Sequence, residues 1–268
     1  MNYLKLVSAY FLVAGLLIVS ADITRAAERE LVDVEIVLAV DTSDSVSATE
    51  HLAQVEGMAK AFETRGFQRI LGGLKTGRIA VAVLYWAGRD QQVFAVPWTL
   101  IDDLKSAREF AAHIRRKASK PWPTLSYTAI GEAMTIAAEA IIDNEFEGER
   151  KIIDLSGDDP ANIGLRPREV RDRLVAAGFT INGLPVLADR KDPESRRELV
   201  DYFEREVIGG RQSFLNPALT FGHYAEAFYR KFLSEVSGIA PDDLDTHLAT
   251  VDVSPSAAAL KVTMQREN

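Results

Sequence analysis

The chain has 268 residues, a formal net charge of −8 and 47% hydrophobic residues, which is enough to build the core of one domain. It contains no cysteine, which excludes disulfides, thiolate metal sites and a cysteine nucleophile. The acidic balance and the lack of a dominant basic patch argue against nucleic acid as a partner.

The first residues have the pattern of an export signal. Lys5 supplies a positive start, residues 6–19 are almost wholly apolar, and Ala21 and Ala26 are small residues at which cleavage can occur. The apolar stretch is short for a membrane span. We predict that residues 1–26 are a signal peptide, with an uncleaved anchor as the alternative. The protein is then exported, periplasmic or secreted, with no membrane span after cleavage.

Apolar runs alternate with helical spacings along the rest of the chain. The run at 92–96 stops at Pro97, which is typical of a short antiparallel edge strand. A turn region is expected around Gly72, Gly73 and Gly77. The other expected strands are 36–40, 78–87, 151–155 and 179–187, with a last short one at 213–215, and the expected helices are 48–66, 102–117, 128–142, 165–177, 193–207 and 223–236.

Strands that alternate with helices predict an α/β fold. We expect a doubly wound, mostly parallel, Rossmann-like central sheet with helices on both faces. The domain is predicted to span residues 31–237. Residues 238–268 lose hydrophobic periodicity and are predicted to form an irregular C-terminal tail.

Three loops leave the expected carboxyl edge of the sheet with oxygen-bearing side chains, and that edge is where ligands bind in open parallel sheets. These candidate metal ligands are Asp41, Ser43 and Ser45 on the first loop, Thr128 on the second and Asp158 on the third. Hard oxygen ligands without His or Cys suit Mg²⁺, with Mn²⁺ or Ca²⁺ as alternatives, rather than zinc or copper. Two carboxylates would leave a dication able to take one more ligand, either water or a carboxylate from a partner. Each hydroxyl also suits a helix cap, and Glu132 suits the first turn of a helix.

The three segments together resemble a known family. Asp41-x-Ser43-x-Ser45 is similar to the first motif of the metal-ion-dependent adhesion site (MIDAS) of von Willebrand factor A domains. The segment from Thr128 to Ala133 resembles the threonine-bearing segment, and Asp158 matches the distal aspartate. The resemblance implies a protein-interaction module in which the metal is completed by an acidic residue of a protein partner, and it does not imply catalysis.

Several further strings resemble an exported bacterial branch of that fold, the domain of unknown function 1194. They lie at residues 77–81, 86–88, 96–102, 181–184 and 207–210. Two positions depart from the pattern of the branch, because Asp159 stands where glycine is usual and Asp44 where a small glycine is common. Both acids add negative charge beside the expected site.

Two alternatives to a metal-dependent interaction module stay open. The first is a structural or scaffold domain whose metal site is only stabilising. The second is a Mg²⁺-dependent phosphatase of the haloacid-dehalogenase type, which needs a general acid two residues after its nucleophilic aspartate. That position is Ser43, which cannot serve as the acid. No serine-hydrolase elbow or phosphate-binding loop occurs, so we predict that the chain is not an enzyme.

Overall fold

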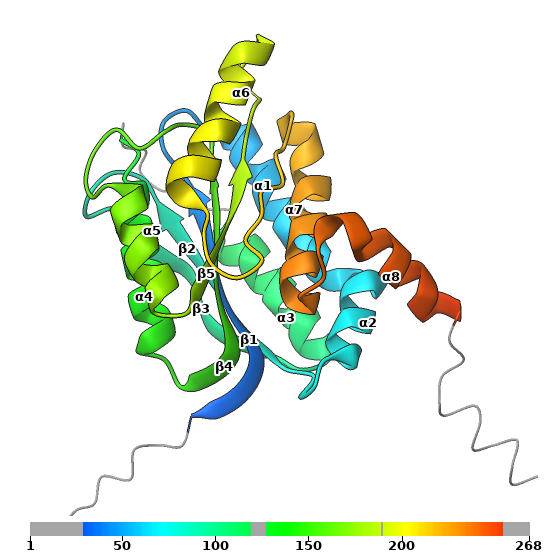
Figure 1. Cartoon of the computed structure of the whole chain (residues 1–268). Helices are drawn as coiled ribbons and strands as arrows, with labels where there is room; N and C mark the ends of the chain where they lie inside the picture. The colour runs from blue at the N-terminus through cyan, green and yellow to red at the C-terminus, as the bar shows by residue number, and fades with distance from the viewer. Residues whose placement is uncertain (1–28, 119–126, 189, 254–268) are drawn as a thin grey trace, which may run out of the picture.

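One five-stranded sheet forms the centre of the computed structural model, which describes residues 29–118, 127–188 and 190–253 (Figure 1). The strand order is β3-β2-β1-β4-β5. β1 is parallel to both β2 and β4, β5 is parallel to β4, and β3 is antiparallel to β2. The strands are β1 (Glu30–Asp41), β2 (Ile79–Trp86), β3 (Gln92–Ile101), β4 (Phe146–Gly157) and β5 (Phe179–Pro185).

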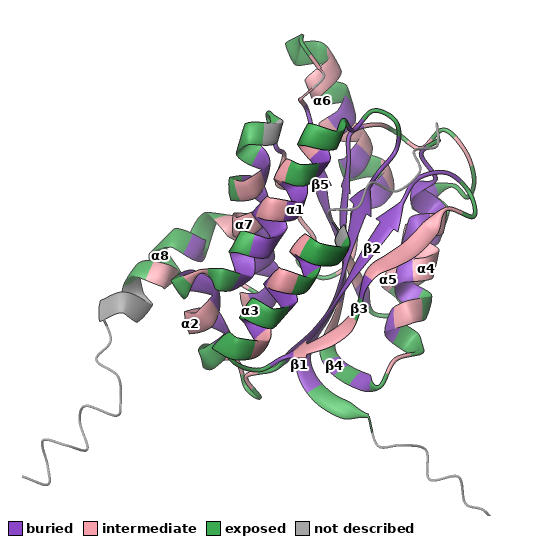
Figure 2. Ribbon diagram, turned by 180° about the vertical axis from the view of Figure 1, so that it is seen from behind, coloured by how far each residue is buried: buried purple, intermediate pink, exposed green. Residues whose placement is uncertain are grey.

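Helices cover both faces of this sheet, which confirms the predicted doubly wound α/β fold (Figures 1 and 2). One face packs against α1 (Ala48–Glu63), α2 (Arg65–Gly73), α3 (Leu104–His113), α7 (Phe221–Ser237) and α8 (Pro241–Val253). The other packs against α4 (Ile130–Ile142), α5 (Pro167–Ala176) and α6 (Pro193–Tyr202). Single π-helical turns extend α3 and α6, at Ile114–Ala118 and Phe203–Val207. No helix within the described ranges is both long and apolar enough to cross a bilayer.

The buried residues of β1 alternate between the two layers, as strand geometry requires. Val34, Ile36, Leu38 and Val40 belong to the core beneath α1 and α7, whereas Val37 and Ala39 belong to the core beneath α4. The last residue of the strand, Asp41, has the parity of Val37 and Ala39. It therefore belongs to the side of the sheet that α4 covers.

Two of the predicted boundaries were wrong. The helix expected over 48–66 ends at Glu63, because Thr64 adopts an extended conformation and its hydroxyl caps a new helix, α2, which fills the expected turn around Gly72. Strand β3 does not stop at Pro97 but continues to Ile101. The register against β2 shifts near Val83, and this irregularity accommodates the proline, which cannot donate to the ladder.

The C-terminal region also differs from the prediction. Residues 241–253 form α8, not irregular structure, and its Leu244 is buried in the core beneath α7. The expected strand at 213–215 is reduced to one isolated parallel bridge, which joins Leu215 to Gly183 of β5. The predicted signal peptide and residues 254–268 lie outside the described residues.

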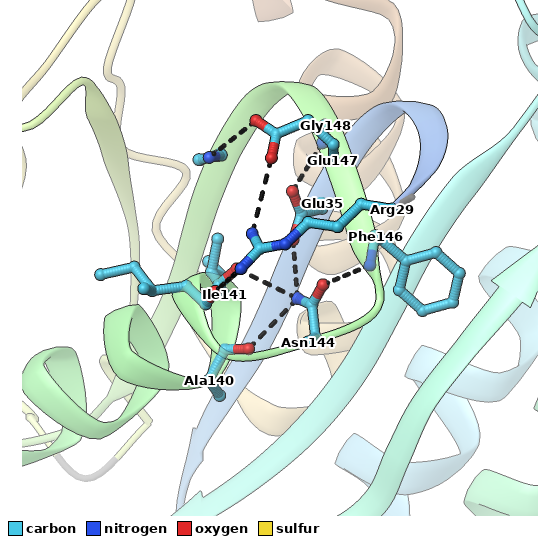
Figure 3. A network of polar contacts seen from close by, with 10 residues as sticks. Arg29, Glu35, Ala140, Ile141, Asn144, Phe146, Glu147 and Gly148 are labelled. Carbon is cyan, nitrogen blue, oxygen red and sulfur yellow. Dashed lines mark hydrogen bonds and ion pairs between the residues drawn. The ribbon is translucent and has the colours of Figure 1, made fainter. Parts of the chain in front are cut away.

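A buried polar network fixes the C-terminal end of α4 to the middle of the sheet (Figure 3). The Glu35 carboxylate accepts hydrogen bonds from the Asn144 side-chain amide at 2.7 Å and from the Gly148 backbone N–H at 2.6 Å. Asn144 in turn accepts from the backbone N–H of Phe146 at 2.7 Å and donates to the last carbonyls of α4. Burial raises the pKa of Glu35. The network fixes the turn between α4 and β4 against β1, and it therefore helps to orient α4 on the sheet.

Candidate functional site

The first loop of the site begins directly at the end of β1. Asp41 is 1% exposed, and its Oδ1 accepts the backbone N–H of Ser43 at 2.8 Å, a local turn that aspartate side chains favour. The hydroxyls of Ser43 and Ser45 lie 3.1 Å apart. The backbone of Thr42 donates to the carbonyl of Trp86 at the end of β2, which ties the loop to the neighbouring strand. The sequence motif is therefore a compact turn that carries Asp41, Ser43 and Ser45 at alternate positions.

A second carboxylate reaches the same place from β4. Asp158 follows the last residue of β4 and is 7% exposed. Burial, followed by the charge of Asp158, raises the pKa of Asp41 to about 8, whereas its contacts with Ser43 lower it. The Oδ2 atom of Asp41 is buried and has no hydrogen-bond partner among the described residues. The site thus holds two buried carboxylates that repel each other, and no cationic side chain among the described residues contacts Asp41.

Thr128 lies at the start of α4, between the ends of β2 and β4. Its backbone N–H donates to the Asn162 side chain at 2.9 Å, and its carbonyl accepts the Asn162 N–H at 3.1 Å. The next residue, Ala129, donates to the Ala87 carbonyl after β2 at 2.8 Å. Thr128 is 3% exposed. These bonds hold Thr128 against the loop that carries Asp158.

The hydroxyls of the site are not used as helix caps. Ser47 caps α1 and forms a reciprocal capping box with Glu50, while α4 begins after Ala129 without a side-chain cap. The alternative interpretation of Ser43, Ser45 and Thr128 as caps was therefore wrong. Their side-chain oxygens remain available for another role.

The loop after β4 is also held from α4. Glu132 accepts the Leu165 backbone N–H at 3.0 Å and forms an ion pair with Arg89 at 3.5 Å. It lies in the first turn of the helix, as predicted, but it contributes more than a favourable charge at the helix end. Asn162, which bonds the backbone of Thr128, had no predicted role. Both residues act as braces that fix the Asp158 loop relative to Thr128.

Gly164 is required where this loop passes Glu132. Its φ is +87°, and a Cβ atom there would overlap the Glu132 carboxylate. We expect Gly164→Ala to lower the free energy of unfolding by about 1–3 kcal/mol. The matched control is Gly72→Ala in α2, where nothing lies within 4 Å of the added Cβ. There the change is expected to stabilise by up to about 1 kcal/mol. Urea denaturation measures the free energy of unfolding of both variants. Equal changes in the two variants would contradict a close contact between Gly164 and Glu132 that stabilises the loop.

The two extra acids have different environments. Asp44 is exposed in the turn between β1 and α1. Asp159 forms an ion pair with Arg190, whose Nη2 lies 2.7 Å from Asp159 Oδ1. Arg190 is 31 residues from Asp159 in the sequence, so no local spacing connects them. The structure therefore places the guanidinium of Arg190 beside the site, which the sequence did not predict.

The comparisons with solved structures agree with this architecture. Proximal thread matrix protein 1 of the mussel byssus matches with a TM-score of 0.54 and 15% identity over 79% of this chain and 49% of that one. A further structure of the same protein has a zinc-occupied MIDAS motif and matches with a TM-score of 0.53, 15% identity, and 80% and 49% coverage. This chain therefore spans about half the length of the mussel protein. The von Willebrand factor domain of the pilus tip protein Mfa5 of Porphyromonas gingivalis matches with a TM-score of 0.53 and 12% identity, over 78% of this chain and 96% of that one.

At these identities the likeness concerns the fold, which is that of a von Willebrand factor A domain. No match was found among curated proteins. A family model, described as Protein of unknown function (DUF1194), matches residues 31–240. The sheet order and this match together show that the chain is a von Willebrand factor A-like protein that belongs to the DUF1194 family.

Proposed function

We propose that the protein is an exported interaction module that binds a divalent cation and, through it, an acidic residue of a protein partner. The single observation that carries the proposal is the Oδ2 atom of Asp41, which is buried and accepts no hydrogen bond among the described residues. A buried carboxylate oxygen is costly unless a donor or a cation compensates it. The negative charge of Asp158 acts on Asp41 and supports a cation as the compensating group.

The surrounding oxygens fit a hard cation. Asp41 and Asp158 would supply the charge, and Ser43, Ser45 and Thr128 would supply neutral oxygens. The described residues contain no cluster of three or more His, Cys, Asp or Glu side chains that could hold a metal, so a cation would depend on this mixed set. Such a set suits Mg²⁺ first, with Mn²⁺ and Ca²⁺ as alternatives.

The charge of the set favours an interaction over catalysis. Two carboxylates formally neutralise a dication and leave it able to attract one further oxygen ligand. A carboxylate of a partner protein provides such a ligand. Ser43 lacks the acid that phosphoryl transfer through Asp41 would need, and the signal-like residues 6–19 support export.

The first test is the melting temperature of the purified protein with and without Mg²⁺ or Mn²⁺. A metal at a concentration 100 times its dissociation constant stabilises the folded state by about 2.7 kcal/mol. For a domain of this size we expect the melting temperature to rise by roughly 5–10 °C. Asp41→Ala should remove the rise, and Asp44→Ala, at the exposed acid of the same loop, should keep it. No rise in the unaltered protein at saturating metal would contradict the proposal.

The partner is tested separately by affinity capture from cell envelope. A protein retained with Mg²⁺, released by a chelator and not retained by Asp41→Ala supports the interaction. If metal raises the melting temperature but no retained protein depends on it, the scaffold alternative is favoured.

A further inference from the structure

The ion pair between Arg190 and Asp159 lies directly beside the proposed metal site. Besides its 2.7 Å contact with the Asp159 carboxylate, Nη2 of Arg190 donates to the backbone carbonyl of Asp158 at 3.1 Å. One guanidinium nitrogen thus contacts both residues of the Asp158–Asp159 pair. The Arg190 side chain is 20% exposed and that of Asp159 is 50% exposed, so the pair lies at the rim of the site.

The position of Arg190 is fixed independently of Asp159. Its backbone N–H donates to the Leu187 carbonyl at 3.1 Å, and its own carbonyl accepts the Arg196 side chain at 2.7 Å. These bonds join the segment between β5 and α6 to the start of α6. The backbone of Arg190 is therefore fixed by its own hydrogen bonds, and its guanidinium contacts the loop after β4.

Asp159 directly follows Asp158 in the chain, and its carboxylate lies at the rim of the site. Without a cation beside it, Asp159 would be a third negative charge close to Asp41 and Asp158. A dication held by those two residues would then face a net negative surrounding, and an incoming carboxylate would be repelled.

We infer that the Arg190–Asp159 pair sets the charge around the proposed cation, so that the bound metal stays attractive to a carboxylate of the partner. The inference rests on the proposed function and specifies how the bound metal keeps its attraction for a carboxylate ligand. Arg190 acts here through Asp159 and Asp158 as a positioning residue, not as a metal ligand.

The inference predicts opposite effects on two affinities. Asp159→Asn leaves the positive charge of Arg190 uncompensated, so Mn²⁺ should bind about two- to five-fold more weakly and acetate should bind the Mn²⁺-loaded protein about two- to five-fold more tightly. Arg190→Gln leaves Asp159 uncompensated, so Mn²⁺ should bind more tightly and acetate more weakly by similar factors. The double variant removes both charges and should return both affinities to within about two-fold of the unaltered protein.

Electron paramagnetic resonance of free Mn²⁺ measures the metal affinity, and water-proton relaxation of the Mn²⁺ complex measures the acetate affinity. If both single variants weaken Mn²⁺ binding, or if neither affinity changes, the inference is overturned and the pair only supports the loop. If Arg190→Gln does not fold, Asp159→Asn at the half-exposed position still tests the inference. Weaker Mn²⁺ binding with tighter acetate binding supports it, and a change of both affinities in the same direction contradicts it. Failure of the unaltered protein to bind Mn²⁺ would instead contradict the proposed function itself.

Discussion

Lys231→Met is expected to lower the free energy of unfolding by about 3–5 kcal/mol, the range observed when one partner of a buried ion pair is removed. Lys231 of α7 is fully buried, and its Nζ lies 2.6 Å from Asp154 Oδ1 and in contact with Glu235 Oε1. Methionine keeps the apolar stem but leaves two carboxylates in the core without their cation. Chemical denaturation of the purified variant measures the loss.

Glu235→Gln is the matched control within the same cluster. Glu235 Oε1 accepts from both Lys231 and the Asn182 side-chain amide, at 2.9 Å for the latter, whereas Oε2 is buried without a partner among the described residues. Glutamine can keep the accepting oxygen and carries no charge at any pH. We expect the free energy of unfolding to change by less than about 1.5 kcal/mol. A similar loss in both variants would mean that packing, not charge, determines the effect.

The free energy of unfolding of the unaltered protein should depend on pH through Glu235. Burial, and then the charge of Asp154, raises the pKa of Glu235 from 4.5 to about 8. Between these values the folded state keeps a proton that the unfolded state has released, so the free energy of unfolding falls as the pH rises through that interval. The difference between the unaltered protein and Glu235→Gln, measured in a chelator from pH 5 to pH 9, should show this fall. A constant difference would contradict a raised pKa.

The order of strands and helices was predictable because each buried segment has its own pattern. The parallel strands are continuous apolar runs, and the helices between them repeat at three- and four-residue spacings. The error at the end of α1 lies where a single residue decides between two locally similar structures. Thr64 separates α1 from α2 through its own side chain, and nothing in the apolar spacing distinguishes that break from a continuous helix.

The site was predictable only in part, for a related reason. Asp41, Ser43 and Ser45 are close in sequence, so their spacing already places them on one turn. The braces of the site are distant in sequence and depend on tertiary packing. Arg190 reaches Asp159 only because the segment after β5 returns beside the loop after β4, a proximity that the strand order creates and that no local spacing encodes.

Asp41→Asn is expected to stabilise the metal-free protein while it removes the effect of metal. The asparagine Oδ1 can keep the 2.8 Å bond from the Ser43 N–H, and its amide nitrogen replaces the buried oxygen that has no donor. The change also removes the repulsion between two buried carboxylates. Relief of this kind is worth on the order of 1–3 kcal/mol, because a like charge nearby and burial both disfavour the ionised group.

For a domain of this size such a gain corresponds to a melting temperature roughly 2–12 °C higher in a chelator. Adding Mg²⁺ or Mn²⁺ should then raise the melting temperature of the unaltered protein but not that of the variant. A gain in the chelator together with the loss of the metal response separates a site that sacrifices stability for binding from a residue that only supports the fold. A structural aspartate would lose stability under both conditions when it is replaced, so a lower melting temperature of Asp41→Asn in the chelator would contradict the assignment of Asp41 as a cation ligand.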